Sequence, residues 1–194
     1  MNSYHIFFLV LFSFFLVLFS CNSGDESEKS AQTSAHGEMS GISNLSFTIP
    51  EGWIKEQPTG SMRKAQFRIP GKNEMGDAEL AIFVFPGGGG GVQANIDRWI
   101  GQFKQPEGNA SAEKAEVKKI ESHGLAITLV YVSGTYLSGS MGGSAKELSG
   151  YAMMAAIVET TSDPWFFKAV GPQATINGWR PEFESFAKTI KMTQ

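Results

Sequence analysis

The sequence predicts an α+β fold, in which an antiparallel β-sheet of about six to seven strands has two main helices packed on it. Segments rich in apolar, β-branched or aromatic residues recur through residues 45–194, as expected of strands. Several of them are separated only by short turns, which join antiparallel neighbours. Two other segments carry apolar residues at three- and four-residue spacing, the period of an amphipathic helix. No internal repeat interrupts this stretch, so we expect one domain over 45–194.

Three strands are expected in the first part of this domain. Residues 45–49 alternate apolar and polar side chains, the period of a half-buried strand. A turn sequence, Pro50–Gly52, follows them. Residues 62–69 repeat the alternation. Residues 80–85 are uniformly apolar, which is typical of a strand buried on both faces.

The first helix is expected over Val92–Gln105. Apolar side chains recur there at helical spacing and form one stripe, made of Val92, Ile96, Trp99, Ile100 and Phe103. The turn sequence Pro106–Asn109 should end this helix.

The second half of the domain contains four more predicted strands and the last helix. The strands are expected at residues 117–121, 125–137, 151–160 and 165–170. The helix should begin near Ala174 and continue past Phe186. Pro181 falls inside that span, so either the helix contains it or the main helix starts there, where the missing N–H costs nothing.

An apolar run and a lone cysteine characterise the N-terminal segment. Residues 6–19 are apolar and shorter than the about 20 residues of a bilayer span, which fits the core of a signal peptide. Leu18–Cys21 resembles a lipobox, the processing site of bacterial lipoproteins, so residues 1–20 are identified as a lipoprotein signal peptide. The resemblance implies cleavage before Cys21 and a diacylglyceryl group on its sulfur. Phe19 is bulkier than usual for the motif; an uncleaved anchor and an ordinary secretory peptide are the alternatives.

Charge is concentrated between the signal peptide and the domain. Residues 21–44 contain four acidic residues and one basic residue, whereas residues 45–194 contain fifteen of each. Because the 21–44 segment is also rich in Ser and Gly, we expect a lipidated Cys followed by a flexible acidic tether. A formally neutral domain gives no sign of the clustered basic surface that nucleic acid requires, so we expect no nucleic-acid partner.

Two motifs near the ends of the domain resemble the PsbP-like family. The first is Phe47–Trp53, which reads Phe-Thr-Ile-Pro-Glu-Gly-Trp, and the second is Trp165–Pro172, which precedes the terminal helix. The resemblance covers most of 45–194 and implies a PsbP-like α+β domain. The family contains photosynthetic accessory subunits and many small bacterial envelope proteins, so the resemblance implies accessory binding rather than catalysis. Residues 85–103 also resemble uncharacterised bacterial lipoproteins.

A glycine run and the helix after it contain the candidate ligand-binding residues. Gly87–Gly91 lies between a predicted strand and a predicted helix, where backbone N–H groups and the helix dipole can hold an anion. No P-loop lysine follows, so the run is either a ligand loop or a flexible connector. The candidate residues are Gly89, Gly90, Gly91 and Arg98. Arg98 either forms a recognition pair with the adjacent Trp99 or is simply solvated.

The sequence contains no catalytic or metal-binding motif. Cys21 is used by the lipid, and the domain has only one histidine, His123, which we expect to be exposed in a turn between two strands. A nucleophilic triad needs a Ser or Cys activated by a histidine that a carboxylate orients, and a zinc site needs several His or Cys ligands. We therefore expect no catalytic residue, no metal and no cofactor, although two distant carboxylates could still meet in space.

These observations favour a membrane-anchored lipoprotein of the bacterial cell envelope, outside the cytoplasm, that acts as a non-catalytic accessory or binding protein. Its expected partners are membrane lipid, through acylated Cys21, and an unknown envelope protein or small ligand. The alternatives are a hydrolase-type enzyme whose site is dispersed along the sequence and a structural component of the envelope. The inner and the outer membrane both remain open.

Overall fold

The computed structural model describes residues 44–72, 75–87, 89–105, 114–139 and 146–193. All of them belong to one compact unit. The predicted signal peptide, Cys21 and the tether up to residue 43 lie outside the described residues. Within the described part, no helix is both long enough and apolar enough to cross a membrane.

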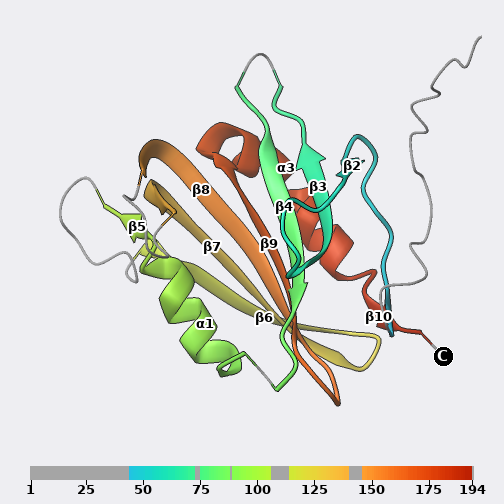
Figure 1. Ribbon diagram of the computed structural model, residues 1–194. Coiled ribbons are helices and arrows are strands. Elements are labelled where there is room, and N and C mark those ends of the chain that lie inside the picture. The colour runs from blue at the N-terminus through green and yellow to red at the C-terminus, as the bar shows by residue number, and fades with distance from the viewer. Residues whose placement is uncertain (1–43, 73–74, 88, 106–113, 140–145, 194) are drawn as a thin grey trace, which may run out of the picture. The chain divides into compact units, whose positions relative to one another are not determined.

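An antiparallel sheet of eight strands forms the centre of the described domain (Figure 1). The strand order is β2-β3-β4-β9-β8-β7-β5, and β6 also pairs with β7. The bounds are Ile54–Glu56 (β2), Arg63–Ile69 (β3), Ala78–Val84 (β4), Phe103–Lys104 (β5), Glu116–Ser122 (β6), Leu125–Ser138 (β7), Lys146–Glu159 (β8) and Trp165–Pro172 (β9). A separate pair joins β1 (Leu45–Ser46) to β10 (Lys191–Met192). The predicted α+β class with an antiparallel sheet is therefore confirmed.

The described main sheet has one or two more strands than predicted, because β2 and β5 have only three and two residues. Segments this short show no periodicity of their own and are held by their neighbours. The predicted strand at 45–49 is shorter than expected, since β1 ends at Ser46. The strands predicted at 62–69, 80–85 and 165–170 are present as β3, β4 and β9.

The two helices differ from the prediction at their ends. Helix α1 covers Gly91–Ile100 and stops five residues earlier than expected, where the Gly101 N–H donates to the Asp97 carbonyl. Phe103 instead belongs to β5 and lies opposite Tyr136 of β7. Helix α3 covers Gln173–Ala187 and contains Pro181, so Pro181 does not mark its start.

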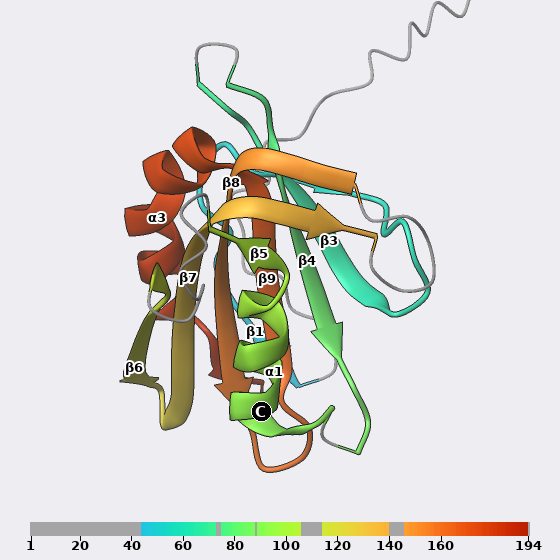
Figure 2. The same cartoon turned by 90° about the vertical axis from the view of Figure 1, so that its left-hand side faces the viewer.

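The helices cover opposite faces of the sheet (Figures 1 and 2). Side chains of a strand point alternately to its two faces, and β8 shows this directly. Ala152, Met154 and Ala156 belong to the core under α3, whereas Met153 and Ala155 belong to the core under α1. Both faces of the central strands are therefore buried, as the apolar runs of the sequence predicted.

On the α1 face, no residue of β2 or β3 belongs to the hydrophobic core under α1, and polar side chains occupy this half of the face. Gln66 of β3 is only 2% exposed. Its amide nitrogen lies 3.2 Å from Glu56 Oε2 and 3.0 Å from Glu79 Oε2. Arg63 forms an ion pair with Glu79 at 2.6 Å, and Arg68 forms ion pairs with carboxylates of its own. The charges of Arg63 and Arg68 are thus paired. Lys168 of β9 borders this half of the face, opposite Ala81 of β4.

Candidate functional site

Lys168 occupies the centre of the α1 face, at the boundary between the polar half and the helix-covered half. It lies in β9 between Phe167 and Ala169, which point into the α3 core, so its own side chain points to the α1 face. Its direct neighbours across the sheet are Ala81 of β4 and Ala155 of β8. Because there is one small side chain on each side, the lysine stem has room to lie along the sheet.

The Lys168 ammonium has one hydrogen-bond acceptor and two aromatic neighbours. Its Nζ donates to Gln102 Oε1 at 2.5 Å. It lies 5.8 Å from the Trp99 ring centre and 5.7 Å from the Tyr136 ring centre, within the range of cation–π attraction. Gln102 is itself fixed, because its N–H donates to the Trp99 carbonyl and its carbonyl accepts from the Leu137 N–H. The ammonium is thus placed by residues of α1, of β7 and of the turn between α1 and β5.

Burial, together with a smaller contribution from the charge of Arg98, lowers the pKa of Lys168 from 10.5 to about 8. Neither Lys168 nor Arg98 forms an ion pair with any residue in the described ranges. Nearby, burial raises the pKa of the Tyr136 hydroxyl, and the Glu79 carboxylate contributes to the rise. The site therefore adjoins the paired charges of β3 and β4 but contains two cations that they do not neutralise.

Asn95 connects the predicted glycine residues to Arg98. This side chain is fully buried in α1. Its Nδ2 donates to the Gly89 carbonyl at 2.9 Å and to the Gly91 carbonyl at 2.6 Å, while its Oδ1 accepts from Arg98 Nη2. The structure therefore brings Gly89, Gly91 and Arg98 together through a residue that the sequence prediction did not include. A polar residue on the buried stripe of an amphipathic helix is the signal that could have found it.

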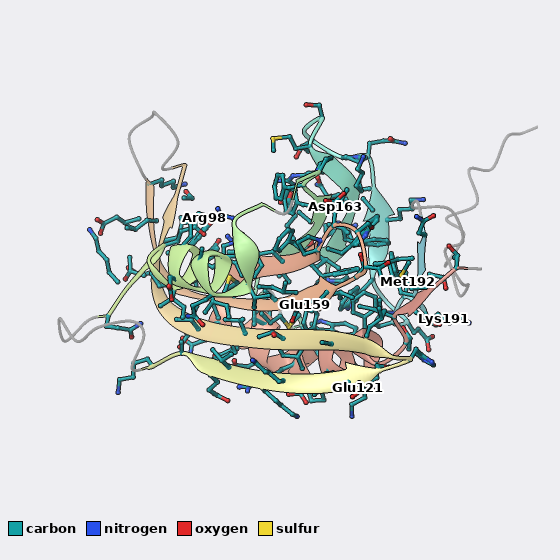
Figure 3. All side chains as sticks on the ribbon, turned by 90° about the horizontal axis from the view of Figure 1, so that it is seen from below. Arg98, Glu121, Glu159, Asp163, Lys191 and Met192 are labelled. Atoms are coloured by element: carbon teal, nitrogen blue, oxygen red, sulfur yellow. The ribbon has the colours of Figure 1, made fainter. Side chains whose placement is uncertain are left out.

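The glycine run is held at both ends. The Gly87 N–H donates to Asp163 Oδ1 at 2.9 Å, and Asn95 holds the Gly89 and Gly91 carbonyls. Gly90 precedes α1 with φ of 96°, a left-handed conformation that glycine adopts without strain. Figure 3 shows Arg98 on the side of α1 away from β6, the strand that carries Glu121. The ligand role predicted for Gly89, Gly90 and Gly91 stays a prediction.

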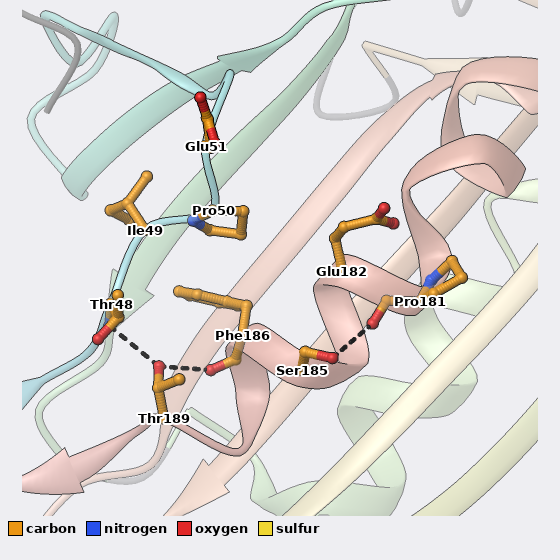
Figure 4. A pocket seen from close by; sticks show the side chains of 9 residues that line it. All are labelled: Thr48, Ile49, Pro50, Glu51, Pro181, Glu182, Ser185, Phe186 and Thr189. Carbon is orange, nitrogen blue, oxygen red and sulfur yellow. Dashed lines mark hydrogen bonds between the residues drawn. The ribbon is translucent and has the colours of Figure 1, made fainter. Parts of the chain in front are cut away.

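A shallow pocket of about 420 Å³ lies between residues 48–51 and α3 (Figure 4). The hydroxyl groups of Ser185 and Thr189 are engaged in local hydrogen bonds. Ser185 donates to the Pro181 carbonyl at 3.0 Å. Thr189 accepts from the Thr48 N–H at 3.0 Å and donates to the Phe186 carbonyl at 2.7 Å. These contacts tie the N-terminal segment to α3 and give Ser185 a structural partner instead of a general base.

A second pocket of about 310 Å³ lies between α3 and β6. Two ion pairs connect the two elements beside it. Arg180 binds Glu116 through both of its terminal nitrogens and lies 4.4 Å over the Tyr131 ring, and Lys118 lies 2.9 Å from Glu184. The charges here are mutually compensated, in contrast to those of Lys168 and Arg98.

His123 lies in the two-residue turn between β6 and β7, where it has φ of 50° and is followed by Gly124 with φ of 74°. It is exposed, so the prediction of an exposed turn residue is confirmed. Among the residues that the structure describes, no group of three or more His, Cys, Asp and Glu side chains could hold a metal ion.

No known protein-family profile matches the sequence, and no curated protein sequence matches it. Among solved structures, the chain is similar to a Pseudomonas aeruginosa protein of unknown function, with 13% identity and a TM-score of 0.44 over 74% of this chain and 88% of that one. It is also similar to the cyanobacterial PsbP protein of Synechocystis sp. PCC 6803, with 13% identity and a TM-score of 0.45 over 80% of this chain and 96% of that one. Because both scores are low, the fold assignment rests on the strand order described above.

Proposed function

We propose that the chain is a lipid-anchored lipoprotein of the bacterial cell envelope whose domain is a non-catalytic binding protein for a small ligand. One observation carries the binding role. The Lys168 ammonium is surrounded by the Gln102 amide and two aromatic rings, and a second cation, Arg98, lies nearby. Such groups orient and hold a ligand, whereas nucleophilic catalysis needs a hydroxyl or thiol next to an oriented base.

The lipid anchor is supported by the sequence alone. The apolar run at residues 6–19, the lipobox-like Leu18–Cys21 and the acidic tether fit together. One acyl chain holds a protein only marginally in a membrane and two or more hold it firmly. Lipidated Cys21 would therefore keep the domain at the membrane surface, on a tether whose mean reach is roughly 25–30 Å.

We further propose that the domain is PsbP-like. The two motifs that carry the resemblance occupy structurally central positions. Phe47 and Trp53 of the opening motif pack against Phe186 of α3, with ring centres 5.5 and 5.3 Å apart. The closing motif is β9, whose Phe167 lies 5.6 Å from the same ring. The two motifs thus meet in one core around Phe186.

Radioactive palmitate labelling in bacterial cells tests the anchor. The Cys21→Ala variant should lose the label and leave the membrane fraction, because it lacks the thiol that accepts the lipid. The control is Ser20→Ala, which keeps a small residue before the cysteine and should stay labelled. Unchanged labelling of the Cys21→Ala protein would contradict the proposal.

Native mass spectrometry of the full-length protein, purified in mild detergent, tests the binding role. The wild-type protein should carry a small ligand that denaturation releases. Lys168→Met should lose this ligand, whereas Lys188→Met, the same change at an exposed position after α3, should keep it. A ligand-free wild-type protein, or consumption of the released compound by the protein, would overturn the non-catalytic binding role.

A further inference from the structure

We propose that Lys168 and Arg98 together form a binding site for a small organic carboxylate, the apolar part of which contacts the Tyr136 ring. The inference deepens the proposed binding role by naming the chemical class of the ligand, and it rests on that role. It does not depend on the lipid anchor.

The charge of Lys168 is uncompensated by any carboxylate in the described ranges, and its side chain is only partly exposed. A lysine held largely away from water normally has a carboxylate partner, because an unpaired buried charge is costly. Lys168 has only the neutral Gln102 and two ring faces among the residues described. Its pKa is lowered by burial and by the charge of Arg98, and no carboxylate in the described ranges opposes this effect. A bound anion would supply the missing partner.

Arg98, whose side chain is exposed, brings a second positive charge to the site. Its charge acts on Lys168 and disfavours the charged lysine, so the two cations are close enough to repel each other. Asn95 holds the guanidinium in place through Arg98 Nη2, and Asn95 itself cannot move because it is buried and bound to the glycine loop. Two like charges fixed near each other create a local positive potential that an anion relieves.

Two arginines of β3 on the same face of the sheet differ from these cations, because each has a carboxylate partner. Arg63 is paired with Glu79. Arg68 is paired with Glu56 at 3.2 Å and with Asp77 at 2.9 Å. The face therefore offers carboxylates to its arginines on β3, yet none of the described carboxylates pairs with Lys168 or Arg98. Because Lys168 and Arg98 lack the carboxylate partners that Arg63 and Arg68 have, we place the bound anion beside Lys168 and Arg98.

The donor count fits a carboxylate. An ammonium has three N–H donors and a guanidinium has five. Among the described residues, Lys168 uses one for Gln102, and Arg98 uses Nη2 for Asn95. The remaining donors can satisfy the two oxygens of one carboxylate. Tyr136 is half-buried beside Lys168 and stacks with Tyr151 at 6.5 Å, so its ring offers an apolar contact for the rest of the ligand.

Titration of ¹⁵N-labelled protein with benzoate tests this inference, with benzamide as a neutral probe of the same shape. The protein is first freed of any ligand by unfolding, dialysis and refolding. Benzoate should shift the amide signals of Lys168, Arg98 and Gln102, and benzamide should bind at least about tenfold more weakly, since a charge-assisted hydrogen bond is lost. Lys168→Met should weaken benzoate binding about tenfold or more, and Arg98→Gln should also weaken it. Lys188→Met should leave it unchanged.

Three results would overturn the inference. Equal affinity for benzoate and benzamide would show that the charge is not recognised. Benzoate shifts centred on Arg180 or Arg68 would place the anion elsewhere. No benzoate binding at 10 mM, about tenfold above the concentration of a weak millimolar complex, would remove the site. None of these results bears on whether the purified protein retains a ligand, so failure of the carboxylate inference is distinguishable from failure of the binding role.

Discussion

The Lys168 ammonium lies 5.8 Å from the centre of the Trp99 ring and donates to Gln102, the third residue after Trp99. Trp99 is 5% exposed and belongs to the core under α1. A cation is therefore held at the border of a hydrophobic core without a carboxylate partner in the described ranges. Such an arrangement lowers the free energy of unfolding, and proteins commonly keep unfavourable groups of this kind where they serve function.

We predict that Lys168→Met stabilises the domain by about 1–3 kcal/mol at pH 7. The folded-state pKa of about 8 lies below the unfolded value of 10.5, so the folded state disfavours the proton. Below pH 8 both states are protonated and the full cost of the buried charge is present. Between pH 8 and 10.5 the folded lysine is neutral while the unfolded one is still protonated, so the cost falls steadily as the pH rises and is gone above pH 10.5. Urea unfolding at pH 7 and pH 10.5 measures both values.

The difference between Lys168→Met and wild type should therefore shrink as the pH rises. The Lys188→Met control should not show this behaviour, because its side chain is exposed. A Lys168→Met protein less stable than wild type at pH 7 would show that the ammonium contributes favourably to the fold, which contradicts our interpretation.

We predict that Asn95→Ala destabilises the domain by about 2 kcal/mol, because the Gly89 and Gly91 carbonyls lose their donor. Hydrogen exchange should become faster in residues 89–92, and Arg98 should lose its fixed position. The control is Gln93→Ala on the same helix, where an exposed hydrogen bond to Asp97 is lost and the change should stay below about 0.5 kcal/mol. Equal effects of the two substitutions would refute a special role for Asn95.

Alanine substitution should have opposite effects on the stability of the domain at Gly171 and at Gly178. A Cβ at Gly171 in β9 would overlap the Ala78 side chain and lie 2.5 Å from its Cα, so Gly171→Ala should cost at least about 2 kcal/mol or prevent folding. A Cβ at Gly178 in α3 meets nothing within 4 Å, so Gly178→Ala should stabilise the helix by about 0.5–1 kcal/mol. Thermal unfolding measures both, and a neutral Gly171→Ala would contradict the close packing of β4 on β9.

The Arg180–Glu116 pair should contribute only at pH values where Glu116 is ionised. The hydrogen bond from Arg180 holds the pKa of Glu116 below 4.5, so the contribution is present above pH 4.5 and is lost as the pH falls through the folded-state pKa. Glu116 is 60% exposed, and Glu116→Gln should therefore cost less than about 1 kcal/mol at pH 7 and nothing at pH 2. A larger cost at pH 2 than at pH 7 would contradict this.

Sequence patterns predicted the long strands and both helices because each pattern extends over several periods. They did not predict β5, since its two residues pair with β7 only after α1 has ended at Gly101. Among the candidate site residues, Arg98 was predicted and lies at the site, whereas Lys168 was missed. Lys168 is the single charge within the apolar segment 165–170, which is a visible signal, but its isolation from carboxylates depends on which strands become neighbours.

The pKa of Lys168 in the ligand-free folded protein tests the central claim most directly. It can be measured from the pH dependence of the ¹³Cε–¹H signal of Lys168, assigned with the Lys168→Met variant. We predict a pKa of about 8, as expected of a buried ammonium with Arg98 nearby and no carboxylate partner. A value near the ordinary 10.5 would show that the ammonium is solvated or paired, and the account of this site would then be wrong.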